Sequence, residues 1–308
     1  WTIGFFVFVL TFADAGTVHA DTWQMSQLMP DAPQSGNGFG GAVAVHGYTA
    51  IVGASSEETS RGAAYVFDYN ILTGDWVQVA RLVAPDRAAL DFFGNDVAVH
   101  DDLVVVGAPG ADLGASSDAG AVYVFKRSLD GDWDYQIKVG MPGIVVANAR
   151  FGRAVDMDDR NLVVGASGSD GNRGVVYTYR KQNGGSGWAH RSTLIPPLVQ
   201  PNDYFGISLA LHEETLVVGM PGDDYLVGGQ NRGSVFIFGR VAFDMWEQHA
   251  QLFAPNGDAD DAFGESVDVY DDVVVVGAPY SADPDTDGVI ADSGSAYVFR
   301  SDPSVRSG

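Results

Sequence analysis

The sequence predicts an all-β fold, a β-propeller built from four-stranded antiparallel blades. Two short signatures predict it, because both recur five times in register. Phe-Gly begins at residues 39, 93, 151, 205 and 263, and a Gly-Ala-Pro-like tripeptide begins at residues 53, 107, 165, 219 and 277. Both recur at intervals of 54 or 58 residues. A repeat of this length made of short strands is typical of propellers and other stacked arrays.

Each repeat contains four segments with strand patterns, which the second repeat illustrates. Residues 97–100 follow Phe-Gly, and residues 103–107 are almost continuously apolar, as in a strand buried on both faces. Residues 123–125 form an aromatic strand preceded by a glycine. The fourth strand begins at Trp133 and ends before Pro142, which cannot continue a hydrogen-bond ladder. The turn between the first two segments is short enough for tight antiparallel pairing.

The two ends of the chain indicate how the propeller closes. The fifth repeat stops after its aromatic strand, and residues 23–30 match the missing tryptophan strand. We therefore expect this N-terminal strand to complete the last blade, which removes a free sheet edge. The propeller is predicted to span residues 21–308, with repeats starting near residues 37, 91, 149, 203 and 261.

The N-terminus predicts export. An apolar run over residues 3–10 precedes Val18-His19-Ala20, a small-x-small cleavage pattern. We interpret residues 1–20 as a signal peptide truncated at its start, too short to span a bilayer. The protein is therefore expected to be secreted, outside the cell or at its surface, without membrane insertion.

Composition excludes several classes of function. The formal net charge is −23, which repels phosphate backbones and argues against nucleic-acid binding. The chain contains no cysteine, which excludes disulfides and thiol chemistry.

The two signatures, with a Gly-x-x-Tyr-Val-Phe strand behind them, resemble the FG-GAP repeat family of integrin α-chain propellers and many secreted proteins. The resemblance covers roughly residues 21–300 and implies a propeller that recognises an extracellular protein or glycan, as a monomer or part of a longer chain. Two departures limit it. Integrin propellers have seven blades, whereas five repeats are visible here. Integrin calcium loops lie between the first two strands, and those turns are too short here to hold that motif.

A calcium site is predicted instead in the longer, acidic loops. The last repeat contains Asp283, Asp285, Asp287 and Asp292, with Gly288 permitting a sharp turn, so that hard oxygens could converge on one Ca²⁺. The alternative is a solvated acidic loop, because Asp292 falls one residue late for an EF-hand-like frame. Weaker candidates are Asn256, Asp258 and Asp260 in the loop just upstream, and weaker still are Asp223 with Asp224 and Asp112 with Asp118.

Other recurring polar and aromatic residues are expected to be structural. The aspartate two residues before Phe-Gly (Asp91, Asp203, Asp261) is expected to make an Asx-turn with its own backbone. His46, His100 and His212 occupy equivalent turns and are expected to lie too far apart to share a metal. The tryptophans that begin the fourth strands are expected to pack between blades, with sugar stacking as the alternative.

The sequence contains no nucleophile elbow, phosphate-cradling loop or His-Glu-x-x-His motif. We therefore expect a non-enzymatic recognition or adhesion module. One alternative is a carbohydrate-active enzyme, such as a glycoside hydrolase, or a lectin, with its site at the central channel. Another is a purely structural module.

Overall fold

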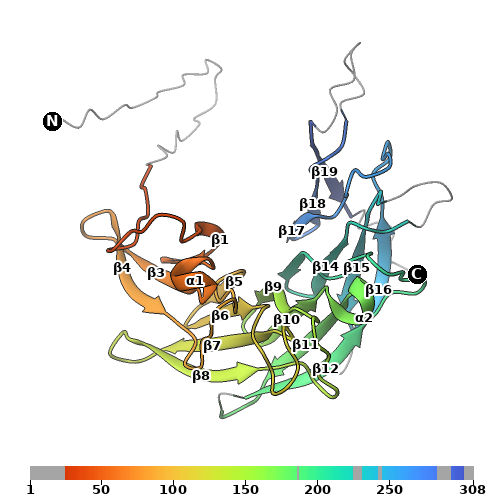
Figure 1. Ribbon diagram of the computed structural model, residues 1–308. Helices are drawn as coiled ribbons and strands as arrows, with labels where there is room; N and C mark the ends of the chain where they lie inside the picture. The colour runs from red at the N-terminus through yellow and green to blue at the C-terminus, as the bar shows by residue number, and fades with distance from the viewer. Residues whose placement is uncertain (1–24, 186, 225–230, 242–244, 283–292, 302–308) are drawn as a thin grey trace, which may run out of the picture.

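The computed structural model describes residues 25–185, 187–224, 231–241, 245–282 and 293–301, which form five antiparallel sheets in chain order (Figure 1). We call these sheets blades one to five. Blade one contains β1 (Phe39–His46), β2 (Thr49–Ala54), β3 (Ala63–Asn70) and β4 (Asp75–Leu82), and blade two contains β5 (Val97–His100), β6 (Leu103–Ala108), β7 (Ala121–Arg127) and β8 (Trp133–Val139). Blade three contains β9 (Phe151–Met157), β10 (Asn161–Ala166), β11 (Val175–Lys181) and β12 (Trp188–Leu194). Blade four contains β13 (Leu209–His212), β14 (Thr215–Met220), β15 (Ser234–Arg240) and β16 (Trp246–Leu252), and blade five contains β17 (Ser266–Tyr270), β18 (Val273–Ala278) and β19 (Ser295–Arg300).

The blades follow one another along an arc, with their first strands on the inside and their fourth strands on the rim (Figure 1). Neighbouring strands within each blade pair antiparallel and in sequence order. The predicted all-β propeller of small antiparallel blades is therefore confirmed, and the predicted strand order is confirmed with it.

The recurring glycines are explained by backbone contact between neighbouring blades. A Cβ atom on Gly53 would lie 2.1 Å from the carbonyl oxygen of Gly94, the glycine of the next Phe-Gly. A Cβ on Gly62 would lie 1.9 Å from the carbonyl oxygen of Phe93. The Phe93 N–H in turn donates to the Arg61 carbonyl of the preceding blade. The same contacts join the later blades, so the two signatures interlock one blade with the next.

Apolar side chains fill the spaces between the blades. The cluster between blades one and two joins Ile51 and Val66 to Phe93, Val104 and Tyr123, all at most 1% exposed. In blades one to three the second strands (β2, β6 and β10) are buried along their whole length, whereas β18 of blade five is partly exposed. The almost continuously apolar second segment therefore has the environment that its composition predicted.

The predicted N-terminal strand is not a strand in the part that the structure describes, since residues 25–30 lie outside any sheet. Leu28 nevertheless packs against blade one, on the cluster that contains Tyr65 and Phe67. Leu82 occupies the corresponding place against blade two. Blade five has three strands among the described residues, and closure of the ring by residues 23–30 stays a prediction.

The connections divide between the two faces of the arc. The short turns that join first to second and third to fourth strands lie on one face, which we call the turn face. The longer connections lie on the opposite face, the loop face, and include two helical turns that the sequence did not predict, α1 (Glu57–Ser60) and α2 (Ser169–Asn172).

In the described residues, no helix has the length and hydrophobicity needed to cross a membrane.

Candidate functional site

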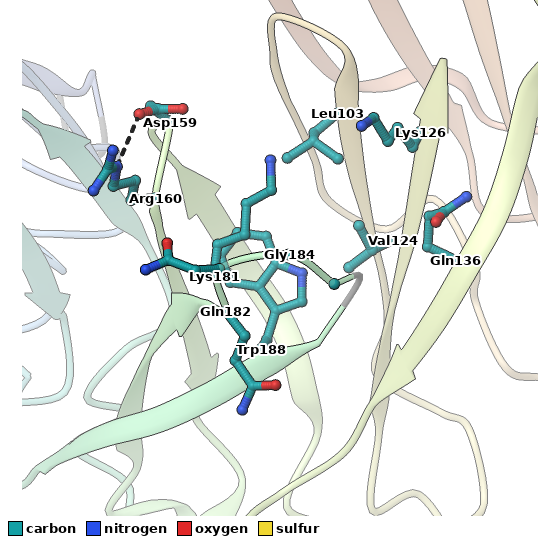
Figure 2. Close-up of a pocket in the computed structure, with 12 residues that line it drawn as sticks. Leu103, Val124, Lys126, Gln136, Asp159, Arg160, Lys181, Gln182, Gly184 and Trp188 are labelled. Atoms are coloured by element: carbon teal, nitrogen blue, oxygen red, sulfur yellow. Dashed lines mark hydrogen bonds and ion pairs between the residues drawn. The ribbon is translucent and has the colours of Figure 1, made fainter. Parts of the chain in front are cut away.

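A groove lies on the turn face between blades two and three, with a cavity of about 470 Å³. Trp188 and Lys181 lie in the middle of it, Lys126 and Gln136 lie on the blade-two side, and Arg160 lies on the opposite side (Figure 2). We call this the basic groove. The complete lining is Leu103, Val124, Lys126, Gln136, Asp159, Arg160, Lys181, Gln182, Asn183, Gly184, Gly185 and Trp188.

The basic groove holds two of the three lysines of a chain with a net charge of −23. Arg160 pairs with Asp159 at 3.3 Å, an ion pair drawn in Figure 2, and both side chains are exposed. Lys181 makes no ion pair with any residue that the structure describes. The lining carries three cations against one carboxylate; since Lys126 is paired with Asp102 and Arg160 with Asp159, the net positive charge of the groove rests on Lys181.

A substitution in one repeat produces this charge. In every blade, a backbone N–H at the end of the third strand donates to one residue of the first turn, at 2.8 Å. That turn residue is Tyr48, Asp102, Arg160, Glu214 and Asp272 in blades one to five. In blades two, four and five it is acidic and pairs with a cation from the third strand: Lys126 with Asp102 at 3.2 Å, Arg240 with Glu214 at 3.5 Å, and Arg300 with Asp272 at 2.6 Å. Blade three has an arginine there. By strand register the counterpart of Lys181 in blade four is Arg240, so Lys181 lies beside a cation where Arg240 lies beside Glu214. The counterpart of Lys126 and Arg300 in blade three is Arg180.

The tryptophans have two kinds of surroundings. Trp133 and Trp246 are buried, as packing between blades predicts, and the guanidinium of Arg127 lies 4.8 Å above the Trp133 ring. Trp188 is half-buried, packing on the cluster between blades two and three while it lines the basic groove. It is therefore both a packing residue and a surface that a ligand can touch.

A second cavity, of about 930 Å³, lies where the first turns of all five blades converge. We call it the axial cavity. Its polar lining includes His46, His100, Asp156, Asp158, Asp159, Arg160, Asn161, His212, Glu213, Glu214, Thr215, Arg240, Tyr270 and Asp271. Acidic and aromatic groups thus meet at one mouth of the channel.

The expectation that the turn histidines lie far apart is wrong for one pair. The rings of His46 and His100 lie 4.2 Å apart, and His46 Nε2 lies 3.1 Å from Asp101 Oδ1. His212 instead packs on Tyr270 at 4.7 Å and accepts a hydrogen bond from the Asp271 N–H. First turns approach one another near the axis of a propeller, so equivalent residues of adjacent blades come into contact even though the blades diverge outward.

Two aspartates on the inner strands link successive blades. Asp96 accepts a hydrogen bond from the Val155 N–H, and Asp156 accepts one from the Leu211 N–H, each at 2.7 Å. Burial disfavours the charged form of both carboxylates, and this effect is larger than the stabilisation of the charged form by these hydrogen bonds. Burial therefore raises the pKa of Asp96 to about 6 and that of Asp156 to about 7. Of the two, Asp156 lines the axial cavity.

The predicted calcium ligands are only partly described. Asp283, Asp285, Asp287 and Asp292 lie outside the described residues. Among the weaker candidates, Asn256 accepts a hydrogen bond from the Tyr297 hydroxyl, Asp260 accepts one from the Asn231 amide, and Asp258 is exposed. Where the structure describes the chain, the one group of three His, Cys, Asp or Glu ligand atoms close enough for a metal is His46, His100 and Asp101.

The aspartates before Phe-Gly are structural, as predicted, but they close a different turn. Asp91, Asp203 and Asp261 are at most 5% exposed. Each carboxylate accepts the backbone N–H of the residue three positions earlier, at 2.5–2.7 Å. They therefore hold the loop that enters the strand rather than the turn that follows.

Sequence reasoning missed the basic groove, although a signal was present. Basic residues follow the aromatic strand in repeats two to five: Lys126-Arg127, Arg180-Lys181, Arg240 and Arg300. Only the position of blade two beside blade three shows that Lys126 and Lys181 line one groove.

The fold and its repeated contacts define a five-bladed β-propeller that presents its cavities on the turn face. The sequence model of the FG-GAP repeat matches residues 23–67, 76–125, 145–179, 188–238 and 246–299. These matches cover most of the chain, and the chain belongs to the FG-GAP repeat family. A comparison with curated proteins finds no significant match.

Proposed function

We propose that this chain is a secreted, non-enzymatic recognition module that binds an acidic glycan in the basic groove. The observation that carries the proposal is the arginine at position 160, where three of the other blades have a paired carboxylate. It leaves Lys181 available for an anionic group such as a uronate or sulfate.

The other lining residues suit a sugar. Trp188 offers an aromatic face for the C–H side of a pyranose ring, and Gln136 and Gln182 offer amide donors and acceptors for hydroxyl groups. The cavity of about 470 Å³ has the size of a small-ligand site. Because the chain as a whole is strongly acidic, binding of an anion must rest on contacts inside the groove rather than on long-range attraction.

The experiment is a calorimetric titration of the chain with an oligoguluronate and a sulfated oligosaccharide, with a neutral cello-oligosaccharide for comparison. We expect the acidic sugars to bind, and Lys181→Gln and Trp188→Ala each to weaken binding at least tenfold. Arg300→Gln removes the same charge at an exposed site elsewhere and should leave the affinity unchanged. Equal binding of neutral and acidic sugars, or no binding of either, would refute the proposal.

Dependence on Ca²⁺ is a separate part of the proposal, through the acidic segment that carries Asp283, Asp285, Asp287 and Asp292. This segment joins β18 to β19 of blade five, whereas the basic groove is lined by residues of blades two and three. Thermal melts in EDTA and in millimolar Ca²⁺ test it, with Mg²⁺ as control. We expect a Ca²⁺-selective rise in Tm, because a metal that binds the folded chain stabilises it. An unchanged Tm would remove Ca²⁺ from the proposal and leave the groove.

The axial cavity supports a second candidate, a carbohydrate-active enzyme or lectin that acts at the channel. The observation in its favour is the convergence of carboxylates with His and Tyr side chains at one mouth. The same oligosaccharides, incubated with the chain and assayed for new reducing ends, distinguish the two. We expect binding without release of reducing ends.

A further inference from the structure

We propose that His46, His100 and Asp101 bind one divalent transition-metal ion of the Zn²⁺ type across the junction of blades one and two. The proposal is independent of the basic groove. The three residues come from the first turns of two blades and lie in or beside the axial cavity.

The geometry of these three side chains is close to that of a metal site. One ligand atom from each residue lies within 4.8 Å of the other two. In a tetrahedral Zn²⁺ site, bonds of 2.0–2.1 Å place ligand atoms about 3.4 Å apart. The distance from His46 Nε2 to Asp101 Oδ1 is already 3.1 Å. Small rotations of the His100 side chain would bring in the third ligand.

The donor set selects the class of metal. Two imidazole nitrogens and one carboxylate oxygen suit Zn²⁺ and related transition metals, whereas Ca²⁺ prefers oxygen ligands alone. Three protein ligands leave a fourth position open toward the cavity. Asp158, Asp159, Glu213, Glu214 and Asp271 line the same cavity, and their negative charge favours a cation there.

The fold explains why, among the described residues, the junction of blades one and two provides this set. The same turn position in successive blades holds His46, His100, Asp158, His212 and Tyr270. His46 therefore meets a second imidazole and a carboxylate, whereas His212 meets the Tyr270 ring and the Asp271 backbone. His212 thus provides a natural control, since it occupies the equivalent turn without a second histidine.

The test uses the full chain, titrated calorimetrically with ZnCl₂ and, in parallel, with Co²⁺ monitored by its visible d–d absorption. We expect one equivalent to bind, and His46→Gln or His100→Gln each to weaken binding at least tenfold and abolish the Co²⁺ band. His212→Gln should change neither. Thermal melts without metal establish that each variant is folded, and a Zn²⁺-dependent rise in Tm should occur in the wild type and in His212→Gln alone.

Two results would overturn the proposal. One is an affinity for Zn²⁺ in His100→Gln equal to that of the wild type. The other is an equal loss of binding in His212→Gln and His100→Gln, which would indicate general attraction to the acidic cavity.

Discussion

At the scale of single residues, the most consequential side chains can each be compared with the residues at the same position in the other repeats. Arg160 reverses the charge of one turn, and His100 places a second imidazole beside His46. Asp156 stands on an inner strand where blades one, two and four have Ala44, Ala98 and Ala210. Each of these residues can therefore be replaced by a residue that another repeat carries at the same position, which the same fold already accommodates.

Asp156 should make stability depend on pH. Its pKa is raised to about 7 in the folded state, mainly by burial, and is near 3.8 when exposed. The unfolded chain therefore loses this proton first, and the contribution of Asp156 to stability is present below about pH 4 and is lost as pH rises toward 7. Relative to Asp156→Ala, the wild type should lose about 1–3 kcal/mol of unfolding free energy between pH 4.5 and 7.5.

Urea unfolding at pH 4.5, 6.0 and 7.5 measures this difference. Because both proteins carry the same other carboxylates, their general acid repulsion cancels in the comparison. Parallel pH profiles for wild type and variant would contradict the raised pKa.

At the scale of elements, the sequence predicted the strands well because their patterns are local. The apolar second strands, the aromatic third strands and the fourth strands that begin at Trp133, Trp188 and Trp246 all lie where the pattern placed them. The helical turns α1 and α2 were not predictable, because each spans four residues with left-handed backbone inside, at Glu58 and Asp170 for example. No apolar periodicity can mark so short a segment.

The candidate sites were harder to predict than the strands because they depend on neighbouring blades. Lys126 and Trp188 are 62 residues apart and line one groove only because blade two lies beside blade three. The prediction that His46 and His100 lie far apart was wrong, because it assumed the separation of the blades at their outer strands. Their first turns lie near the axis of the propeller, where adjacent blades are much closer together. The predicted calcium loop stays a prediction.

The interlock of the blades can be tested at Gly165. A Cβ atom there would lie 2.0 Å from the carbonyl oxygen of Gly206 in the next blade, and backbone cannot rotate away as a side chain can. Gly165→Ala should therefore lower the unfolding free energy by about 2–3 kcal/mol, measured by chemical denaturation. Gly185→Ala, where the nearest heavy atom is 3.8 Å away and φ is not positive, is the matched control. A cost no greater than that of the control would contradict the interlock.

At the scale of the whole molecule, the first and last blades each expose an apolar face that lies buried between neighbouring blades elsewhere in the propeller. Val275 and Val298 of blade five are 40% and 68% exposed, whereas their counterparts in blade two, Val105 and Val124, are at most 1% exposed. On blade one, Val43 and Val45 are exposed, in contrast to Val97 and Val99. We predict that these faces meet when the ring closes, with residues 23–30 between them.

A lysine at position 298 tests closure. If the ring closes, Val298→Lys places a charge in an apolar interface and should cost about 2–4 kcal/mol. Val79→Lys, at an exposed site on the outer strand of blade one, should change stability by less than about 0.5 kcal/mol. The melting temperature should not depend on protein concentration, because closure occurs within one chain. Equal effects of the two lysines would contradict closure, and a concentration-dependent Tm would indicate a second copy on this face.

The proposed recognition of an acidic ligand by a protein of net charge −23 rests on one local reversal of charge, at Arg160. The most direct measurement is therefore the affinity of Arg160→Asp for the acidic oligosaccharides. This variant restores the carboxylate of blades two and five, and it gives Lys181 an acidic neighbour in the place where Glu214 pairs with Arg240. We predict that Arg160→Asp folds with an unchanged or higher Tm and binds the acidic sugars at least tenfold more weakly than the wild type. Wild-type affinity in a folded Arg160→Asp variant would show that the basic groove is not the binding site.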